Sequence, residues 1–201
     1  MTAHDGLEAL KRELAETCHK AFRRGLVGGA GGNVSVRVPG EERALITATG
    51  VSLGDVAPET VVLVDLQGAL VDGAPGLRPS KETGFHVCAY RLRPHVGAVV
   101  HLHPPHATAF AVCGMELPLV TDGAMLNLKK VPIVGHAPSG SAELHRLVEE
   151  GLRRNPDAKA ILMERHGMFA MGPNLTVAFN LADLVEDTAK IAILSRLLRP
   201  Q

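Results

Sequence analysis

Two histidines placed two residues apart are the feature of this sequence that most clearly suggests chemistry. His101 and His103 follow the apolar segment 98–100 and precede a Pro104-Pro105 pair. Side chains at positions i and i+2 of a strand point to the same face of a sheet, so both imidazoles can reach one ion. The pair therefore predicts part of a metal site where a strand runs into a loop, a common location for functional residues.

A third metal ligand has to come from elsewhere in the chain. His166 is the best candidate, because it follows the apolar segment 158–163 and precedes Gly167, where the chain can turn tightly beside an ion. Three imidazoles leave coordination positions open for substrate, as in a catalytic zinc site. The alternative third ligands, each expected instead to be structural or to support a ligand, are His86, His106 and His136. A chance pair of histidines is the other interpretation, since the chain has ten.

Glu82 is a carboxylate that could serve such a metal. It lies in the segment Pro79-Ser80-Lys81-Glu82, which we place in the first turn of a helix. The functional interpretation is a metal ligand of the resting state that acts as a base once substrate displaces it. The alternative is an acidic residue that only complements the helix dipole. The sequence leaves both interpretations open.

The glycine-rich segment 28–33 fits neither the Walker pattern nor the dinucleotide-binding spacing, so it is no evidence for ATP or NAD. Its backbone amides, together with the turn at Thr49-Gly50 and the helix start at Ser80, could form a concave site for a phosphate or carboxylate group. A flexible loop without a ligand is the alternative.

The elements that must position these residues follow from periodicity and from turn residues. Helices are predicted from Leu7 to Phe22, closed by Gly25, from Ser80 to Arg93, from Ser141 past Leu152, and from Asn174 to about Leu198. Strands are predicted at 34–38, 44–49, 61–66, 97–103, 130–134 and 158–163. Successive strands without intervening helices favour antiparallel pairing. The pattern predicts one α/β sandwich domain over residues 1–201.

The composition limits the kinds of partner. Lysine plus arginine equals aspartate plus glutamate at 21 each, and no basic run alternates with aromatics, so neither nucleic acid nor a membrane surface is expected as a partner. Cys18, Cys88 and Cys113 are scattered in apolar segments and are expected to be reduced packing residues. We see no leader segment and no apolar run of about 20 residues, so the cytoplasm is the expected location.

Five motifs together resemble the class II aldolase/adducin family, and the resemblance covers nearly the whole chain. They occur in the family's order and spacing, and they are Gly31-Gly32-Asn33-Val34-Ser35, Ile46-Thr47-Ala48-Thr49-Gly50, Pro79-Ser80-Lys81-Glu82, Gly97-Ala98-Val99-Val100-His101-Leu102-His103 and Arg165-His166-Gly167. The resemblance implies an α/β/α sandwich around a mixed, mainly antiparallel sheet. It also implies a ring-shaped homotetramer with active sites between neighbouring subunits.

The resemblance further implies one divalent metal per subunit, expected to be Zn²⁺, on His101, His103 and His166, with Glu82 as both ligand and proton shuttle. The positions that would hold the substrate's phosphate are Gly32, Asn33, Thr49, Gly50, Ser80 and Lys81. The implied activity is retro-aldol cleavage of a phosphorylated ketose to dihydroxyacetone phosphate and an aldehyde, through a metal-stabilised enediolate. The alternatives are decarboxylation of a 3-oxo-tetronate 4-phosphate and an adducin-like module without catalysis.

The chain departs from the aldolase members of this family at four places. Ala30 stands where they have threonine, and Lys81 where they have serine, so the anion site loses two hydroxyls and gains a cation. A tyrosine that assists protonation in the family falls near Asp122, and a C-terminal tail with a second tyrosine is missing. Tyr90, the one tyrosine present, is expected in the core. An amidohydrolase barrel and an all-β cupin also use paired histidines, but neither suits this length and helix content.

Overall fold

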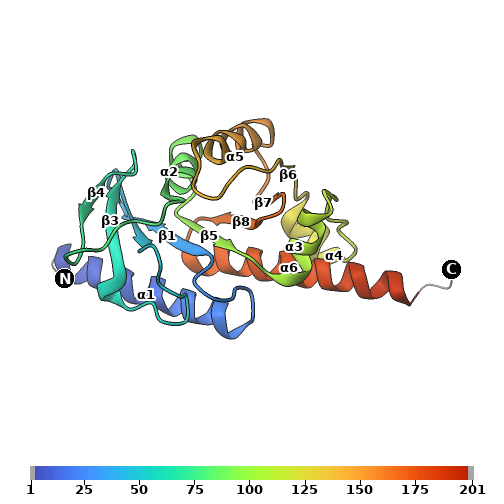
Figure 1. Cartoon of the computed structure of the whole chain (residues 1–201), viewed down its shortest axis with the longest axis horizontal. Coiled ribbons are helices and arrows are strands. Elements are labelled where there is room, and N and C mark those ends of the chain that lie inside the picture. The colour runs from blue at the N-terminus through green and yellow to red at the C-terminus, as the bar shows by residue number, and fades with distance from the viewer. Residues whose placement is uncertain (1–2, 199–201) are drawn as a thin grey trace.

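A single eight-stranded sheet runs through the computed structural model, which describes residues 3–198 (Figure 1). The strand order is β4-β3-β2-β1-β5-β8-β7-β6. All neighbouring strands are antiparallel except the pair β6 and β7, which is parallel. The predicted mixed, mainly antiparallel sheet is therefore confirmed.

The elements, in chain order, are α1 (Ala3–Arg23), β1 (Asn33–Arg37), β2 (Arg43–Thr47), the 3₁₀ turn η1 (Pro58–Thr60), β3 (Val61–Asp65), β4 (Leu70–Asp72), α2 (Thr83–Leu92), β5 (Ala98–Leu102), α3 (Pro105–Val112), α4 (Asp122–Leu128), β6 (Ile133–Val134), α5 (Ala142–Arg154), β7 (Ala160–Met163), β8 (Gly167–Gly172) and α6 (Leu175–Leu197).

Helices cover both faces of the sheet and give the expected α/β/α sandwich. One buried cluster packs α1, α3, α4 and α6 against one face, and a second packs α2 and α5 against the other. Successive residues of a strand point to opposite faces, so β1 sends Val34 and Val36 into the first cluster. Asn33 and Ser35 are buried on its other face, on the side of α2. Figure 1 shows α2 and α5 above the sheet and α1 and α6 below it.

Two helix starts agree with the sequence and one does not. Ser141 and Asn174 accept hydrogen bonds from the backbone N–H groups of Leu144 and Val177, as predicted for N-cap residues. The predicted start of α2 at Ser80 is wrong, because the helix begins at Thr83. Ser80 still supports this end, since its carbonyl accepts a bond from Thr83 N and its hydroxyl one from Glu82 N.

The sequence reading missed the short elements β4, α3 and α4, and also β8. Helix α3 is held by a long-range cap that no local pattern reveals, because the carboxylate of Glu186 in α6 accepts bonds from His106 N and Ala107 N. Strand β8 reads Gly-Met-Phe-Ala-Met-Gly and is buried on both faces, so it lacks the alternation that marks a half-exposed strand.

Among the residues that the structure describes, no helix has the length and apolar content needed to cross a bilayer. All three cysteines are free thiols. Cys18 and Cys88 are buried as predicted, whereas Cys113 is exposed at the end of α3 and is not a packing residue.

Candidate metal centre

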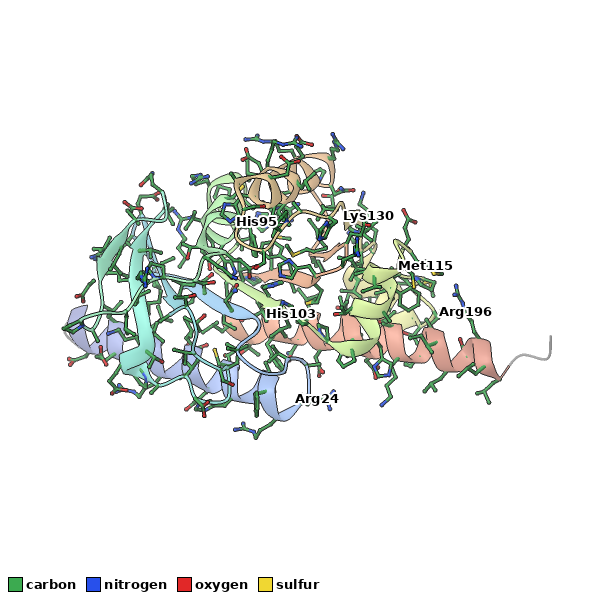
Figure 2. All side chains as sticks on the ribbon, viewed as in Figure 1. Arg24, His95, His103, Met115, Lys130 and Arg196 are labelled. Carbon is green, nitrogen blue, oxygen red and sulfur yellow. The ribbon has the colours of Figure 1, made fainter. Side chains whose placement is uncertain are left out.

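Three histidines from distant parts of the chain converge at one end of the central strands. One ring nitrogen from each of His101, His103 and His166 lies within 4.8 Å of the others. The ring centroids of His101 lie 4.8 Å from those of both His103 and His166, and the remaining pair is 5.1 Å apart. Figure 2 places His103 near the middle of the molecule, where β5 ends. The convergence that the sequence predicted is therefore present.

Strand pairing explains how His166 reaches the other two. His101 lies in β5 and His103 immediately follows it, whereas His166 lies in the turn between β7 and β8. Strand β8 is antiparallel to β5 with Met168 opposite Leu102, so the turn before β8 meets the end of β5. The tight turn uses a positive φ of 56° at Arg165, not at Gly167 as the sequence suggested.

Glycines allow the backbone to approach these imidazoles. A Cβ on Gly167 would lie 2.4 Å from Leu102 O and 2.6 Å from His103 Cδ2. A Cβ on Gly31 would lie 2.7 Å from His103 Nδ1, and one on Gly32 would lie 2.8 Å from His101 O. The glycine-rich segment is therefore a close-packed wall of the site, and the absence of side chains is what makes room for the rings.

The hydrogen bonding of His101 determines which of its nitrogens faces the cluster. Its Nδ1–H donates to the carbonyl of Met168 at 2.8 Å, which leaves the Nε2 lone pair directed at the site. That Nε2 lies 3.0 Å from His103 Nε2. Burial holds the pKa of His101 well below its ordinary value and lowers that of His103 to about 4, so both rings are neutral at pH 7.

Glu82 joins the histidines from the N-terminal end of α2. It occupies the N-cap position, one residue before the helix, and is 3 % exposed. Its Oε2 lies 3.3 Å from His101 Nε2 and its Oε1 lies 3.2 Å from His166 Nε2. Since burial disfavours a charged His101, that contact is an approach of two electron-rich donor atoms and not an ion pair.

Two further side chains hold the Glu82 carboxylate. Asn33 Nδ2 donates to Oε2 at 2.8 Å, and Ser139 Oγ donates to Oε1 at 2.6 Å. Burial alone would raise the pKa of this carboxyl, but the hydrogen bonds from His166, Ser139 and Asn33 hold it well below its usual value. The group is therefore a carboxylate at neutral pH.

The donor set fits a divalent metal. Three imidazoles and one carboxylate bring nitrogen and oxygen ligand atoms together in a nearly buried space, an arrangement that a cation at the centre would stabilise. Imidazole and carboxylate together suit zinc and other first-row divalent ions. Nδ1 of His166 is buried without a partner among the described residues, so this ring has no second hydrogen bond like the one between His101 and Met168.

A cavity of about 170 Å³ opens beside these donors. Glu82, His103 and His166 line it, and so does every residue expected to hold the substrate's phosphate, namely Gly32, Asn33, Thr49, Gly50, Ser80 and Lys81. Asn33 and Ser80 are buried, whereas Thr49, Gly50 and Lys81 are exposed at its mouth. The structure thus brings all of the predicted site residues together, with His101 fully buried beside Glu82 and His103.

The rival third ligands have other contacts. Nδ1 of His106 bonds to Glu186 at 2.6 Å, His136 is exposed, and His86 lies in the core bonded to Asn33. Ser139, which bonds to Glu82, was not found by sequence reasoning. It lies in the loop before α5, and no spacing pattern links this loop to Glu82.

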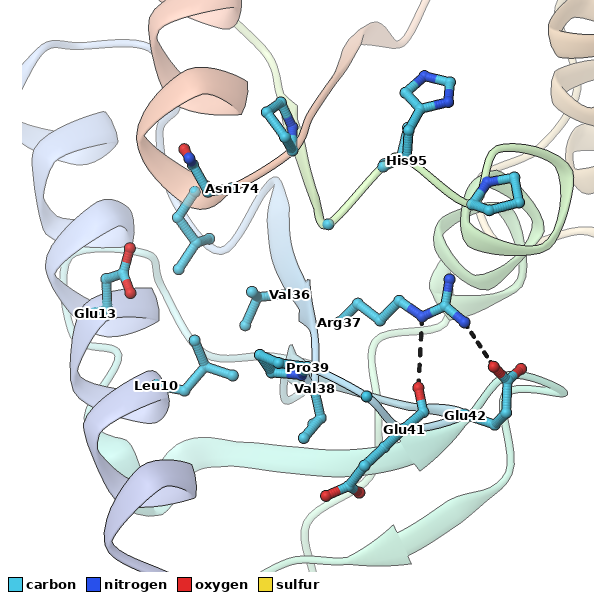
Figure 3. Close-up of a pocket in the computed structure, with 16 residues that line it drawn as sticks. Leu10, Glu13, Val36, Arg37, Val38, Pro39, Glu41, Glu42, His95 and Asn174 are labelled. Carbon is cyan, nitrogen blue, oxygen red and sulfur yellow. Dashed lines mark hydrogen bonds and ion pairs between the residues drawn. The ribbon is translucent and has the colours of Figure 1, made fainter. Parts of the chain in front are cut away.

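A wider cavity of about 670 Å³ lies elsewhere, at the opposite ends of β1 and β5 (Figure 3). Its cation Arg37 is already paired within the protein, since it bonds to the Glu41 carbonyl and to the Glu42 carboxylate. The histidine cluster and the loops expected to bind an anion both lie at the smaller cavity, so size alone does not identify the candidate site.

Comparison with known proteins gives a consistent result. The family model described as class II aldolase and adducin N-terminal domain matches residues 12–193. An L-fuculose phosphate aldolase of Methanococcus vannielii is 35 % identical over 180 residues, which cover 90 % of this chain and 93 % of that protein. A 5-deoxy-D-ribulose 1-phosphate aldolase of Bacillus thuringiensis serovar kurstaki is 31 % identical over 185 residues, covering 92 % and 84 %.

Among solved structures, YgbL from Escherichia coli, described as a putative aldolase/epimerase/decarboxylase, superimposes with a TM-score of 0.83 at 29 % identity, covering 94 % of this chain and 90 % of that one. The fold, the site and these relatives define the protein as a carbon–carbon lyase. It belongs to the class II aldolase and adducin family. The expectation of an enzyme is confirmed, and the alternative of a module without catalysis is set aside.

Proposed function

We propose that this protein is a zinc-dependent aldolase that cleaves a phosphorylated ketose, of the L-fuculose 1-phosphate type, into dihydroxyacetone phosphate and an aldehyde. The convergence of His101, His103, His166 and Glu82 beside a small cavity with anion-binding loops is the observation that carries the proposal. A bound zinc ion would be held by the three histidines and would supply a Lewis acid for the substrate's oxygens.

The protein's own groups have separate roles in this proposal. The loops at Gly32, Thr49-Gly50 and Ser80 would bind the phosphate through backbone and hydroxyl groups at the cavity. Glu82 would move the proton. Cleavage takes a proton from the substrate's hydroxyl oxygen, the bonding electron pair stays on the ketose carbon, and that carbon then gains a proton.

We also propose that the working form is a cytoplasmic homotetramer with the site completed at a subunit interface. A cavity of about 170 Å³ is small beside the roughly 300–1,000 Å³ of typical ligand pockets, so it suits the phosphate end of the substrate and leaves the aldehyde end outside. Exposed apolar side chains gather on α3, the loop after it, α4 and the end of α6, and are Val112, Met115, Met125, Leu126, Leu194 and Leu197. Such a surface favours a partner subunit, and three free thiols suit a reducing compartment.

Decarboxylation of a 3-oxo-tetronate 4-phosphate is a second candidate, and Lys81 is the observation that favours it. Its stem lies against Gly140, where an added Cβ would meet Lys81 Cδ at 3.0 Å, and it lines the cavity. A cation here could bind a substrate carboxylate as well as a phosphate. Ala30 lines the same cavity with a methyl group, so one hydroxyl of the aldolase members is absent.

Product analysis separates the two reactions. The zinc-loaded enzyme would be incubated with L-fuculose 1-phosphate, 5-deoxy-D-ribulose 1-phosphate and 3-oxo-tetronate 4-phosphate, and assayed for triose phosphate and for carbon dioxide. We expect triose phosphate from a ketose 1-phosphate. Carbon dioxide without triose phosphate would overturn the aldolase assignment. A purified protein without stoichiometric divalent metal would overturn both.

A further inference from the structure

A stripe of polar residues on α2 faces a pair of polar residues on β1 in the interior of the protein. Glu82 is the N-cap of α2, and His86 and Tyr90 lie within the helix. The three are spaced four residues apart and therefore lie on one face. Asn33 and Ser35 are two apart on β1 and point to that same side. The exposure of these five residues is 5 % or less, so each polar atom depends on a protein partner.

The five side chains form one continuous chain of hydrogen bonds. Asn33 Nδ2 lies 2.8 Å from Glu82 Oε2, and Asn33 Oδ1 lies 2.6 Å from His86 Nε2. His86 Nδ1 lies 2.7 Å from Ser35 Oγ, which lies 2.6 Å from the Tyr90 hydroxyl. Helix and strand residues alternate along this chain, so it connects the candidate metal site with the packed core.

Chemistry fixes the direction of every proton in the chain. The Glu82 carboxylate can only accept, so Asn33 must turn its NH₂ toward it and its oxygen toward His86. That oxygen can only accept, so His86 carries its proton on Nε2, and its bare Nδ1 accepts from Ser35. The single Ser35 proton is then used, so the Tyr90 hydroxyl donates to Ser35. All donors point toward Glu82.

The critical contact in this chain is the one between His86 and Asn33. An amide can rotate by half a turn with little change in shape, and the rotated Asn33 would set its oxygen against the Glu82 carboxylate. The Nε2–H of His86 opposes this rotation. In the rotated amide the NH₂ group of Asn33 would face that N–H, and two donors would be in contact. His86 therefore selects the amide orientation that holds Glu82.

We propose that His86 is a positioning residue: through the amide of Asn33 it fixes the Glu82 carboxylate beside the three histidines, while Ser35 and Tyr90 fix the tautomer of His86. The effect on turnover rests on the proposed function, whereas the effect on the metal site and on the tautomer does not. Partners that orient metal-binding groups affect metal affinity or activity by roughly 10- to 100-fold in other proteins.

The first test is a double-mutant cycle between His86 and Asn33, with Co²⁺ as the metal probe. We expect His86→Leu to weaken Co²⁺ binding about tenfold and to lower kcat more than KM with the best sugar phosphate. In the Asn33→Ala background the same substitution should have no further effect. His86→Gln, which keeps a donor and an acceptor, should restore most of the loss. Equal losses in both backgrounds would overturn the proposal.

A second test reads the tautomer directly in the metal-free protein. Long-range ¹H–¹⁵N spectra of ¹⁵N-histidine-labelled protein should show His86 with its proton on Nε2, assigned by the loss of these signals in His86→Gln. A proton on Nδ1 would overturn the proposal. If His86→Leu does not fold, Ser35→Ala tests the same chain one step further from Glu82 and should increase the Nδ1–H population.

Thr188→Val is the matched control. Thr188 is a buried polar residue of α6 whose hydroxyl donates to Leu184 O. Its replacement therefore shows how far the loss of a buried hydrogen bond away from the site changes metal affinity and kcat. We expect Co²⁺ affinity and kcat to stay unchanged in this variant. A wild-type enzyme that turned over no sugar phosphate would refute the proposed function alone, because the Co²⁺ cycle and the spectra need no substrate.

Discussion

The carboxylate of Glu82 is shared between two sets of neighbours. Its Oε2 faces His101 and Asn33, and its Oε1 faces His166 and Ser139. One oxygen therefore connects to the core of the protein and the other to the loop before α5. A group held in this way can lie beside a metal and still be released toward substrate when one set of contacts changes.

Replacing Glu82 with glutamine tests its role as the proton shuttle. Glu82→Gln keeps the size of the side chain, but it replaces one of the two accepting oxygens with an NH₂ donor and removes the base. We expect the three histidines to keep most of the bound zinc, while kcat falls at least 100-fold, the usual range for a general acid–base group. Zinc analysis and steady-state kinetics measure the two effects. Glu149→Gln on α5 is the control, and full activity of Glu82→Gln would show that the shuttle is another residue.

Buried histidines also predict how the stability of the metal-free protein depends on pH. Burial lowers the pKa of His86 to about 3 and that of His103 to about 4, from 6.5. Between pH 6.5 and 4 the unfolded chain therefore binds protons that the folded protein does not bind. The free energy of unfolding should fall as pH drops through this window, by about 1.4 kcal/mol per pH unit for each such proton.

Urea unfolding in EDTA at pH 7.5, 6.0 and 5.0 measures this slope. His86→Gln removes one of the buried imidazoles. The slope of the unfolding free energy against pH should then decrease by the contribution of about one proton. A free energy of unfolding that stays constant or rises as the pH falls would contradict the expected sign.

At the scale of elements, the site depends on three segments that end at the same place. The end of β5 provides two histidines, the β7–β8 turn provides the third, and the glycine-rich segment before β1 closes over them. Asn33, the first residue of β1, is directly opposite His101 in the antiparallel register. A shift of this register by one residue would send Asn33 to the other face of the sheet and break its bond to Glu82.

The glycine-rich segment offers a matched pair of substitutions. A Cβ on Gly31 would lie 2.7 Å from His103 Nδ1, whereas one on Gly28 has no atom within 4 Å. We expect Gly31→Ala to displace His103 and weaken zinc binding about tenfold, and Gly28→Ala to bind zinc like the wild type. Competition with a chromogenic chelator measures both affinities. Equal affinities in the two variants would show that the close approach of Gly31 does not position the ring.

At the scale of the whole molecule, a group of exposed apolar side chains gathers at one end. Helices α3 and α4 pack beside the C-terminal half of α6, which extends beyond the sheet (Figure 1). Leu126 is 76 % exposed and Leu197 is also 76 % exposed, a costly arrangement for a lone subunit. The proposed homotetramer would cover this surface.

Charged substitutions in this surface test the assembly. We expect Met125→Asp combined with Leu126→Asp to convert the proposed tetramer into smaller species in native mass spectrometry, because burying two carboxylates at an interface is unfavourable. Val71→Asp, at an exposed apolar position of the edge strand β4, is the control and should leave the mass unchanged. A tetramer that survives the double substitution would place the interface elsewhere.

The sequence by itself determined most of the layout and the chemistry. Amphipathic periodicity predicted α1 and α5, because it shows which face of a helix is buried. Short apolar runs rich in Val, Leu and Ile predicted β1, β2, β3, β5 and β7, which are buried on both faces. The pair His101 and His103 could be predicted from the sequence, because two residues that are two apart on a strand point to the same face of the sheet. His166 could be selected only by its position after a strand and before a glycine.

Only the tertiary structure decided how His166, Ser139 and His86 relate to Glu82. His166 reaches the site because β8, which has no alternating pattern, pairs between β5 and β7. Ser139 and His86 act on the carboxylate directly or through Asn33, across separations of about 50 residues or more. Periodicity describes the environment of one element at a time, whereas these contacts depend on which elements pack together, and that is a property of the whole folded chain.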